Sequence, residues 1–190
     1  MPSILLEAPA DEPVTLADAK AFIRVEHADD DDVIAALIAA ARIHVEAQTR
    51  RALVTQTWRL TRDVWPESGR LLVLPVPLVS LVAARVYRAD GTAQTIDPAA
   101  FTVDTAAAPA VLNFARGALA APGRVAGGIE IDVTCGYGDA DDVPAPLRQA
   151  IRMLVAHWYE HRGVVASGAE VAVMPAGVAA LIGPYKVLAL

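Results

Sequence analysis

The residues with the clearest chemical potential form the string His157-Trp158-Tyr159-Glu160-His161. On a helix, His157 and His161 lie one turn apart on the same face, where two imidazoles can bind one zinc ion. This H-x-x-E-H spacing is that of inverted zinc peptidases, which need a third, carboxylate ligand further along the chain. Glu170 is the only later acid, and it stands in a glycine-containing segment. We interpret the string as the end of an amphipathic helix and keep a zinc hydrolase using His157, Glu160 and His161 as an alternative.

Other signatures of catalysis or cofactor binding are weak. Gly136-x-Gly138 lacks the third glycine of a dinucleotide fingerprint and is followed by acids, so it predicts a turn. The single cysteine, Cys135, allows no disulfide within the chain, and we interpret it as a partly buried residue at the end of a strand. None of the four serines stands in a nucleophile-elbow pattern. We therefore predict no catalytic residue, no cofactor, no metal and no enzymatic activity.

Composition excludes several classes of protein. Of the 190 residues, 55% are hydrophobic but only 5% are aromatic, because alanine (39) and valine (23) dominate. The longest uncharged run, Val171 to Tyr185, has 15 residues and is broken by proline and glycine, so we expect no membrane span, which needs about 20 apolar residues. The net charge of −6 argues against binding nucleic acid by bulk attraction. Residues 1–13 contain no basic residue, so we expect neither a signal nor a transit peptide and a cytoplasm-like compartment.

Helical patterns stand at both ends of the chain. Thr15 is a candidate N-cap for a short helix from Leu16 to about Val25. Four aspartates, 29–32, are best explained as cap and first-turn acids of a second helix of about 20 residues, with apolar positions at helical spacing from Val33 onwards. That helix is rich in alanine, so both of its sides could be buried. A third helix opens at residues 143–146 and ends near Gly163.

The middle of the chain predicts six or seven short strands. Residues 127–135 alternate between apolar and acidic side chains, which is typical of a half-buried strand. Asp90-Gly91 is the strongest hairpin signal. Further strands are expected within residues 53–64, 71–74, 81–87, 94–96, 101–103 and 111–114.

These patterns predict an α+β fold, an α-helical bundle of three main helices with an inserted antiparallel β-domain and an extended C-terminal tail. The expected parts are an N-terminal arm (1–14), a helical stem (15–52 and 144–163), a β-rich insertion (53–138), and a flexible loop followed by an apolar tail (164–190). A short apolar terminus either docks into a neighbouring protein or folds back on the stem helices, and the pattern leaves both possibilities open.

Several strings of this sequence, taken in order, resemble head–tail connector (adaptor) proteins of tailed phages, prophages and gene transfer agents. The resemblance covers almost the whole length. The matching strings are 12–20 (EPVTLADAK), 31–42 (DDVIAALIAAAR), 53–58 (LVTQTW), 136–139 (GYGD), 143–151 (VPAPLRQAI), 157–160 (HWYE) and 183–185 (GPY).

The resemblance implies a structural protein of the particle neck, made in the host cytoplasm. Such proteins form a homo-oligomeric ring, usually of twelve copies, beneath the portal protein. The ring extends the DNA channel, lets DNA pass without specific binding, and supports a stopper or other tail-proximal protein. The C-terminal segment in this family tends to dock onto the portal, which we carry over to Val178, Leu181, Ile182, Tyr185 and Leu188.

Two further points follow from the resemblance. Another neck protein, such as a stopper, is an alternative, but the long helices at both ends argue against it. The acid clusters 29–32 and 139–142 either line the channel or cap helices, and capping is the simpler interpretation.

Overall fold

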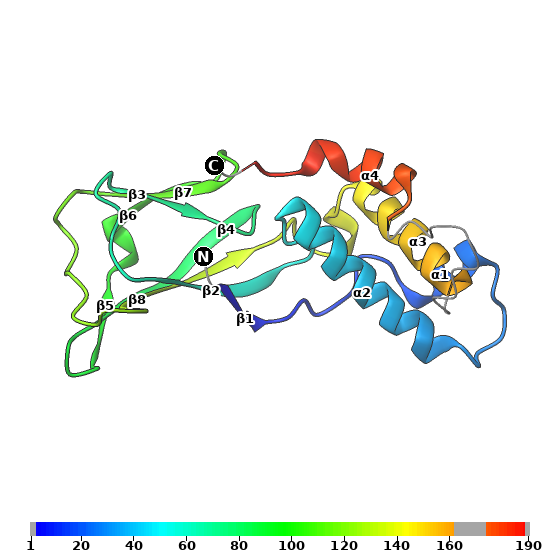
Figure 1. Ribbon diagram of the computed structural model, residues 1–190, viewed down its shortest axis with the longest axis horizontal. Helices are drawn as coiled ribbons and strands as arrows, with labels where there is room; N and C mark the ends of the chain where they lie inside the picture. Colours follow the sequence, from blue (N-terminus) through cyan, green and yellow to red (C-terminus); the bar gives the residue numbers. More distant parts are fainter. Residues whose placement is uncertain (1–2, 162–173, 189–190) are drawn as a thin grey trace, which may run out of the picture. The chain divides into compact units, whose positions relative to one another are not determined.

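The computed structural model describes residues 3–161 and 174–188, which divide into two compact units (Figure 1). The β-rich unit consists of described residues within 1–10, 55–137 and 187–190, and the helical unit of those within 11–54 and 138–186. By sequence, the β-rich unit has seven basic and eight acidic residues, whereas the helical unit has nine basic and fourteen acidic residues. Nearly all of the net negative charge therefore belongs to the helical unit, at −5 against −1 for the β-rich unit.

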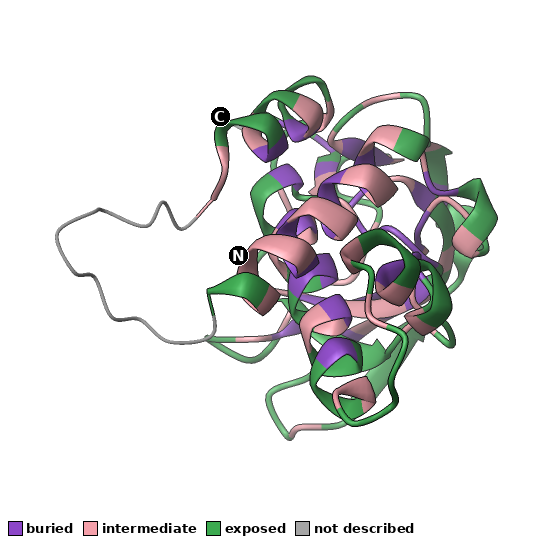
Figure 2. Cartoon of the chain, turned by 90° about the vertical axis from the view of Figure 1, so that its right-hand side faces the viewer, coloured by how far each residue is buried: buried purple, intermediate pink, exposed green. Residues whose placement is uncertain are grey.

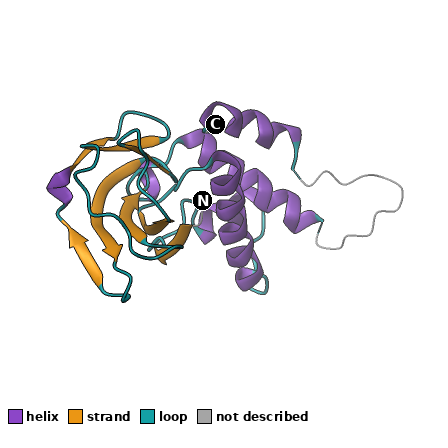
Figure 3. Ribbon diagram, turned by 60° about the vertical axis from the view of Figure 1, so that its left-hand side comes forward, coloured by secondary structure: helices purple, strands orange, loops and turns teal. Residues whose placement is uncertain are grey.

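All four described α-helices belong to the helical unit (Figure 3): α1 (Leu16–Ile23), α2 (Asp31–Thr49), α3 (Ala145–Glu160) and α4 (Ala176–Ile182). The Thr15 hydroxyl accepts a hydrogen bond from the Asp18 backbone N–H at 3.0 Å, as an N-cap should. Both α1 and α2 end at an arginine in the left-handed conformation, Arg24 and Arg50, so the chain turns sharply there.

The helices pack through small and branched apolar side chains, each helix having one buried side and one more exposed side (Figure 2). α3 packs against each of the other three helices. The fully buried side chains of this core are Ile34, Ala41, Val45, Leu147, Ala150, Ile151, Leu154, Val155, Val178 and Ile182. Their spacing of three and four residues is the reason these segments are helices with one apolar face.

The β-rich unit contains two antiparallel sheets. The larger sheet has the order β1-β2-β8-β4-β5, with β1 (Ser3–Glu7) and β5 (Ala93–Ile96) at its edges. Between them lie β2 (Gln56–Arg62), β8 (Ile129–Cys135) and β4 (Leu78–Tyr87). The smaller sheet has the order β3-β7-β6, formed by Arg70–Val73, Ala110–Phe114 and Phe101–Asp104.

The central strand β8 sets the two faces of the larger sheet. Ile129, Ile131 and Val133 are fully buried and define the apolar face. Glu130 and Asp132 alternate with them and point to the other face. The predicted hairpin is also confirmed, since β4 and β5 pair around Gly91, whose φ of 86° suits glycine.

The α+β class is confirmed, and two expectations for the chain ends are corrected. Residues 176–182 form α4, so the C-terminal segment is not an extended tail after three helices. The sequence suggested a tail because glycine and proline surround this short helix. At the other end, Ser3–Glu7 of the expected arm form an edge strand paired with β2, a partner that begins about fifty residues later. The expected loop, 164–177, lies outside the described residues as far as residue 173.

Within the described part of the chain, no helix is both long and apolar enough to cross a bilayer.

Candidate docking site

The five residues expected to dock onto a partner fall into two groups. Val178 and Ile182 are fully buried, one turn apart on the side of α4 that faces the helical core. Leu181 and Tyr185 are half-buried. Leu188 is 86% exposed, the largest exposure of any described leucine. The structure therefore leaves Leu188, and in part Leu181 and Tyr185, available to a partner, while Val178 and Ile182 hold α4 on the bundle.

The close packing of α4 depends on its small residues. α4 packs on α3 and also meets α2. A Cβ atom added to Gly177 would come within 2.8 Å of the Met153 Cε of α3, so a larger residue would require that side chain to move. Pro175 precedes the first turn, where the missing N–H is not needed by the helix. The local sequence thus makes a short helix that is stable through packing.

A hydrogen bond holds the segment after α4. The Arg51 Nε donates to the backbone carbonyl oxygen of Tyr185 at 2.7 Å, linking the end of α2 to the short helical turn Gly183–Tyr185. The donor is charged, which strengthens such a bond relative to a neutral pair. The link spans 134 positions of sequence. It holds the backbone at the end of the Gly183–Tyr185 turn within the helical unit.

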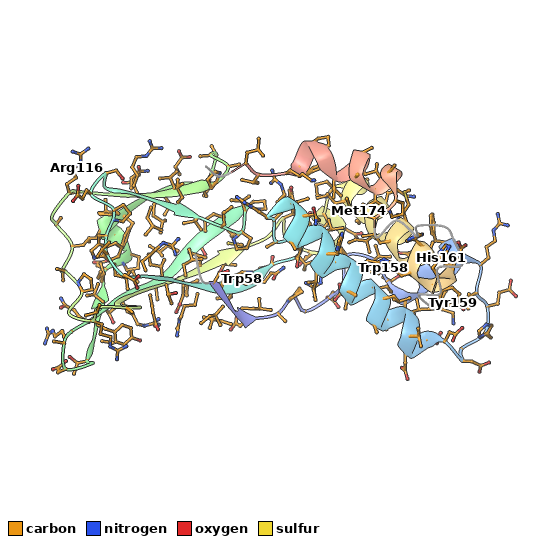
Figure 4. The ribbon with its side chains drawn as sticks, in the orientation of Figure 1. Trp58, Arg116, Trp158, Tyr159, His161 and Met174 are labelled. Atoms are coloured by element: carbon orange, nitrogen blue, oxygen red, sulfur yellow. The ribbon has the colours of Figure 1, made fainter. Side chains whose placement is uncertain are left out.

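The members of the H-x-x-E-H string have structural contacts, and Figure 4 labels three of them. Trp158 makes an edge contact with the His44 ring of α2, with 5.8 Å between ring centroids. The Tyr159 hydroxyl donates to Asp30 at 2.6 Å. His161 lies at the C-terminus of α3, with its Nδ1 2.8 Å from the His157 carbonyl oxygen. The contacts of Trp158 and Tyr159 hold α3 against α2 and against Asp30, the residue that precedes α2.

The two histidine rings are neighbours, with 4.6 Å between their centroids. Within residues 3–161 and 174–188, no group of three His, Cys, Asp or Glu side chains is placed to hold a metal ion. Glu170, the third ligand considered from the sequence, lies outside the described residues.

The two acid clusters contact helix termini. Asp30 accepts from Tyr159, and Asp31 forms an ion pair with Lys20 at 2.5 Å. In the second cluster, the Asp142 carboxylate accepts the backbone N–H of Asp139 at 2.9 Å and so closes the turn before α3. The Asp142 bond agrees with the interpretation of the second cluster as a cap, whereas Asp30 at the N-cap of α2 makes no side-chain capping bond, and Asp31 and Asp32 lie in the first turn, next to the positive end of the helix dipole.

A polar network on the larger sheet was not foreseen from the sequence. Arg59 of β2 donates two hydrogen bonds to Asp132 of β8, at 2.7 and 2.9 Å. Arg85 of β4 donates a third, at 2.7 Å. Asp132 is only 4% exposed, and burial alone would raise its pKa, but the two guanidinium groups outweigh that effect and hold the pKa below its usual range.

The network extends through neighbouring side chains. Glu130 lies 3.3 Å from Arg59 and accepts the Tyr87 hydroxyl at 2.9 Å. That hydrogen bond raises the pKa of Tyr87. Arg124 stacks on the Tyr87 ring, 4.1 Å from its centroid. The only sequence signal was the alternation of acids in β8, and their arginine partners lie about fifty or seventy residues earlier.

Cys135 is fully buried at the end of β8, and burial raises the pKa of its thiol to about 12. Such a thiol is protonated at neutral pH and unreactive, which agrees with the structural interpretation of this residue.

Comparison with known proteins gives the following matches. Residues 13–104 match the model of the phage gp6-like head-tail connector protein family. Comparison of the sequence with curated proteins finds no significant match.

Three solved chains are similar over the full length, each comparison covering 100% of this chain and 97% of the other. They come from the "virion of native gene transfer agent (GTA) particle" (TM-score 0.84, 24% identity), the "neck of empty GTA particle computed with C6 symmetry" (0.80, 25%) and the "neck of native GTA particle computed with C12 symmetry" (0.80, 26%).

Proposed function

We propose, from the match of residues 13–104 to the phage gp6-like head-tail connector family, that the protein is a structural adaptor in the neck of a phage or gene transfer agent particle. The observation that carries the proposal is the full-length similarity to chains from the particle neck, at 25 and 26% identity. It extends the family assignment to α3 and α4, beyond the residues that the family model matches.

The adaptor is proposed to form a ring beneath the portal protein, with twelve copies. The symmetries of the related neck structures, C12 and C6, support a ring of that size, because a twelvefold ring also obeys sixfold symmetry. The ring extends the DNA channel and receives a stopper or another tail-proximal protein. A net charge of −6 suits a protein that lines a DNA channel, because a negative surface repels the phosphates and DNA can pass without binding.

The C-terminal segment is proposed to dock onto the portal through Leu188, Tyr185 and Leu181. Support comes from the exposure of Leu188 and from the bond with Arg51, which holds the backbone carbonyl of Tyr185 in place. Pre-organisation of this kind lowers the entropic cost of association. Val178 and Ile182 take no direct part, since they are buried in the bundle.

The role is proposed to need no catalysis. The family is one of structural connectors. The contacts of His161 with the His157 carbonyl and of Tyr159 with Asp30 give the H-x-x-E-H string a structural purpose at the end of α3.

Co-purification with the cognate portal protein tests the proposal. We expect the wild-type chain to be retained by portal rings and to appear in electron micrographs as a ring on the tail-facing side. A Leu188→Asp variant should lose this retention, whereas Val64→Asp, at another exposed apolar position (69% exposed), should keep it. Loss in both variants, or in neither, would contradict docking through the chain end.

A further inference from the structure

The side of α2 that faces away from the helical core carries no charged side chain for four turns. Val33, Ala36, Ala40, Ile43 and Ala47 follow one another at intervals of three and four residues, and all five are exposed. We call these five residues the α2 outer face. Val33 is 41% and Ile43 56% exposed, which is high for branched apolar side chains on a helix that has a well-packed opposite side.

The charges of this helix are directed elsewhere. Arg42 is only 8% exposed and donates to Glu12 and to Glu46, both at 2.8 Å. Glu46 in turn accepts the Leu53 backbone N–H at 2.9 Å. Asp31 and Asp32 lie in the first turn of α2, where negative charge interacts favourably with the helix dipole. The opposite side of the helix packs through Ile34, Ile38, Ala41 and Val45.

α2 therefore has two apolar sides. One side is buried in the helical core of this chain, and the other, the α2 outer face, is exposed. A helix that is apolar all round is normally buried all round. The outer side of an ordinary surface helix carries charged and polar residues. The helical unit is rich in charged residues, with fourteen acidic and nine basic ones, yet none of them is among the five residues of the α2 outer face. Their absence from the α2 outer face indicates that this face is covered in the assembled state.

We propose that the α2 outer face is the contact with a second copy of this chain, the next subunit of the ring. The inference rests on the proposed function. The charge distribution favours this partner: every copy brings a helical unit of net negative charge, so like charges oppose the approach of two copies least at a surface without charged side chains. The α2 outer face meets this condition. Because it also has no basic side chain, it offers nothing to DNA phosphates.

The geometry of a ring agrees with this partner. Head-to-tail contacts in a closed ring need two different surfaces on each subunit. α4 offers a second uncharged, exposed surface at Ala176, Gly177 and Ala180. Alanine at three of the five positions of the α2 outer face allows another backbone to approach closely, with Val33 and Ile43 as the projecting side chains.

The size of the face predicts when the contact forms. From Val33 to Ala47 a helix rises about 21 Å, and its width of about 10 Å gives roughly 200 Å² of contact. A stable interface buries about 800 Å² on each partner. The α2 outer face alone is therefore too small to hold two free copies together, and it contributes when the portal has already aligned the subunits.

Photo-cross-linking in the assembled ring tests the proposal. With p-benzoylphenylalanine in place of Ile43, irradiation of portal-bound rings should give a product of twice the chain mass, in which both cross-linked peptides come from this chain. The same probe in place of Ala35, an exposed residue on another side of α2, should give little of it. Cross-links to the portal or to another neck protein, or no cross-link, would overturn the proposal.

A charge substitution separates this inference from the proposed function. Ile43→Glu should fold like the wild type yet be recruited into rings at least about tenfold less well, because each subunit would bury a carboxylate against the next. Ala35→Glu serves as the matched control and should assemble normally. If the wild type forms no ring on the portal, the proposed function fails and the inference with it. If the wild type and Ile43→Glu form rings equally well, only the inference fails.

Discussion

The Arg51 guanidinium and the Tyr185 carbonyl oxygen, 2.7 Å apart, connect the end of α2 to the C-terminal segment of the chain. Together with the burial of Val178 and Ile182, this bond makes the segment as far as Lys186 part of the helical unit rather than a free tail, whereas Leu188 belongs to the β-rich unit. The sequence left two possibilities open for this segment, folding back on the helices or docking into a neighbour. Different residues of the segment correspond to each of them. The buried residues fold back, and the exposed Leu188 is the residue for which we propose docking.

The first prediction concerns the Arg51 bond. Arg51→Met keeps most of the side-chain bulk but removes the donor, and it should lower the free energy of unfolding by about 1–2 kcal/mol. It should also weaken binding to the portal, because the turn that carries the candidate docking residue Tyr185 is no longer held in place. Urea unfolding and portal pull-down measure the two effects. Unchanged portal binding in a destabilised variant would show that the bond serves stability alone.

The second prediction separates the two groups of candidate docking residues. Ile182→Ala leaves a cavity between α4 and the core and should cost about 3 kcal/mol of stability. Leu188→Ala should leave the unfolding midpoint within the experimental error, since Leu188 is exposed, and should weaken portal binding. Urea titration of both variants, followed by pull-down of the stable one, checks the assignment. A large stability loss in Leu188→Ala would contradict it.

The third prediction is a pH dependence from Asp132. Its pKa is lower in the folded protein than in the unfolded chain, so its contribution is complete above the unfolded value of about 4 and is lost as the pH falls through the folded value. Asp132→Asn should cost about 3 kcal/mol at pH 7, because Arg59 and Arg85 lose their partner. The difference from the wild type should shrink below about pH 4.

Urea unfolding of the β-rich unit at several pH values measures this difference. Glu67→Gln is a suitable control, because Glu67 is an exposed acid of the same unit. A stability difference for Asp132→Asn that is constant between pH 7 and pH 3 would contradict the ion-pair explanation.

The fourth prediction concerns metal. If the H-x-x-E-H string is structural, protein purified without chelators should contain no stoichiometric zinc, and His157→Ala should still assemble with the portal. Metal analysis by mass spectrometry decides the first point and pull-down the second. One zinc per chain, lost in the His157→Ala variant, would restore the hydrolase alternative.

Much of the fold could be predicted from the sequence because its signals are local. The spacing of Ile34, Ile38 and Val45 gives α2, and the alternation around Ile131 gives β8. Asp90-Gly91 gives the hairpin between β4 and β5. In each case the residues that define the element lie within one element or one turn.

The missed features depend on partners far along the chain. β1 has no clear pattern of its own and becomes a strand through β2. α4 is too short to be stable alone and forms because α3 covers Val178 and Ile182. The bonds of Asp132 with Arg59 and of Arg51 with Tyr185 span 73 and 134 positions, distances at which no periodicity operates. For the same reason, the sequence could not separate Leu188 from Ile182 as docking candidates.

The most direct test of the central claim is cryo-electron microscopy of the neck of particles that carry this protein. We expect a ring of twelve copies directly beneath the portal, with Leu188 at the portal surface and α2 of each copy against the next. A neck map whose portal-proximal ring is built from a different protein, with this chain absent from the particle, would contradict it.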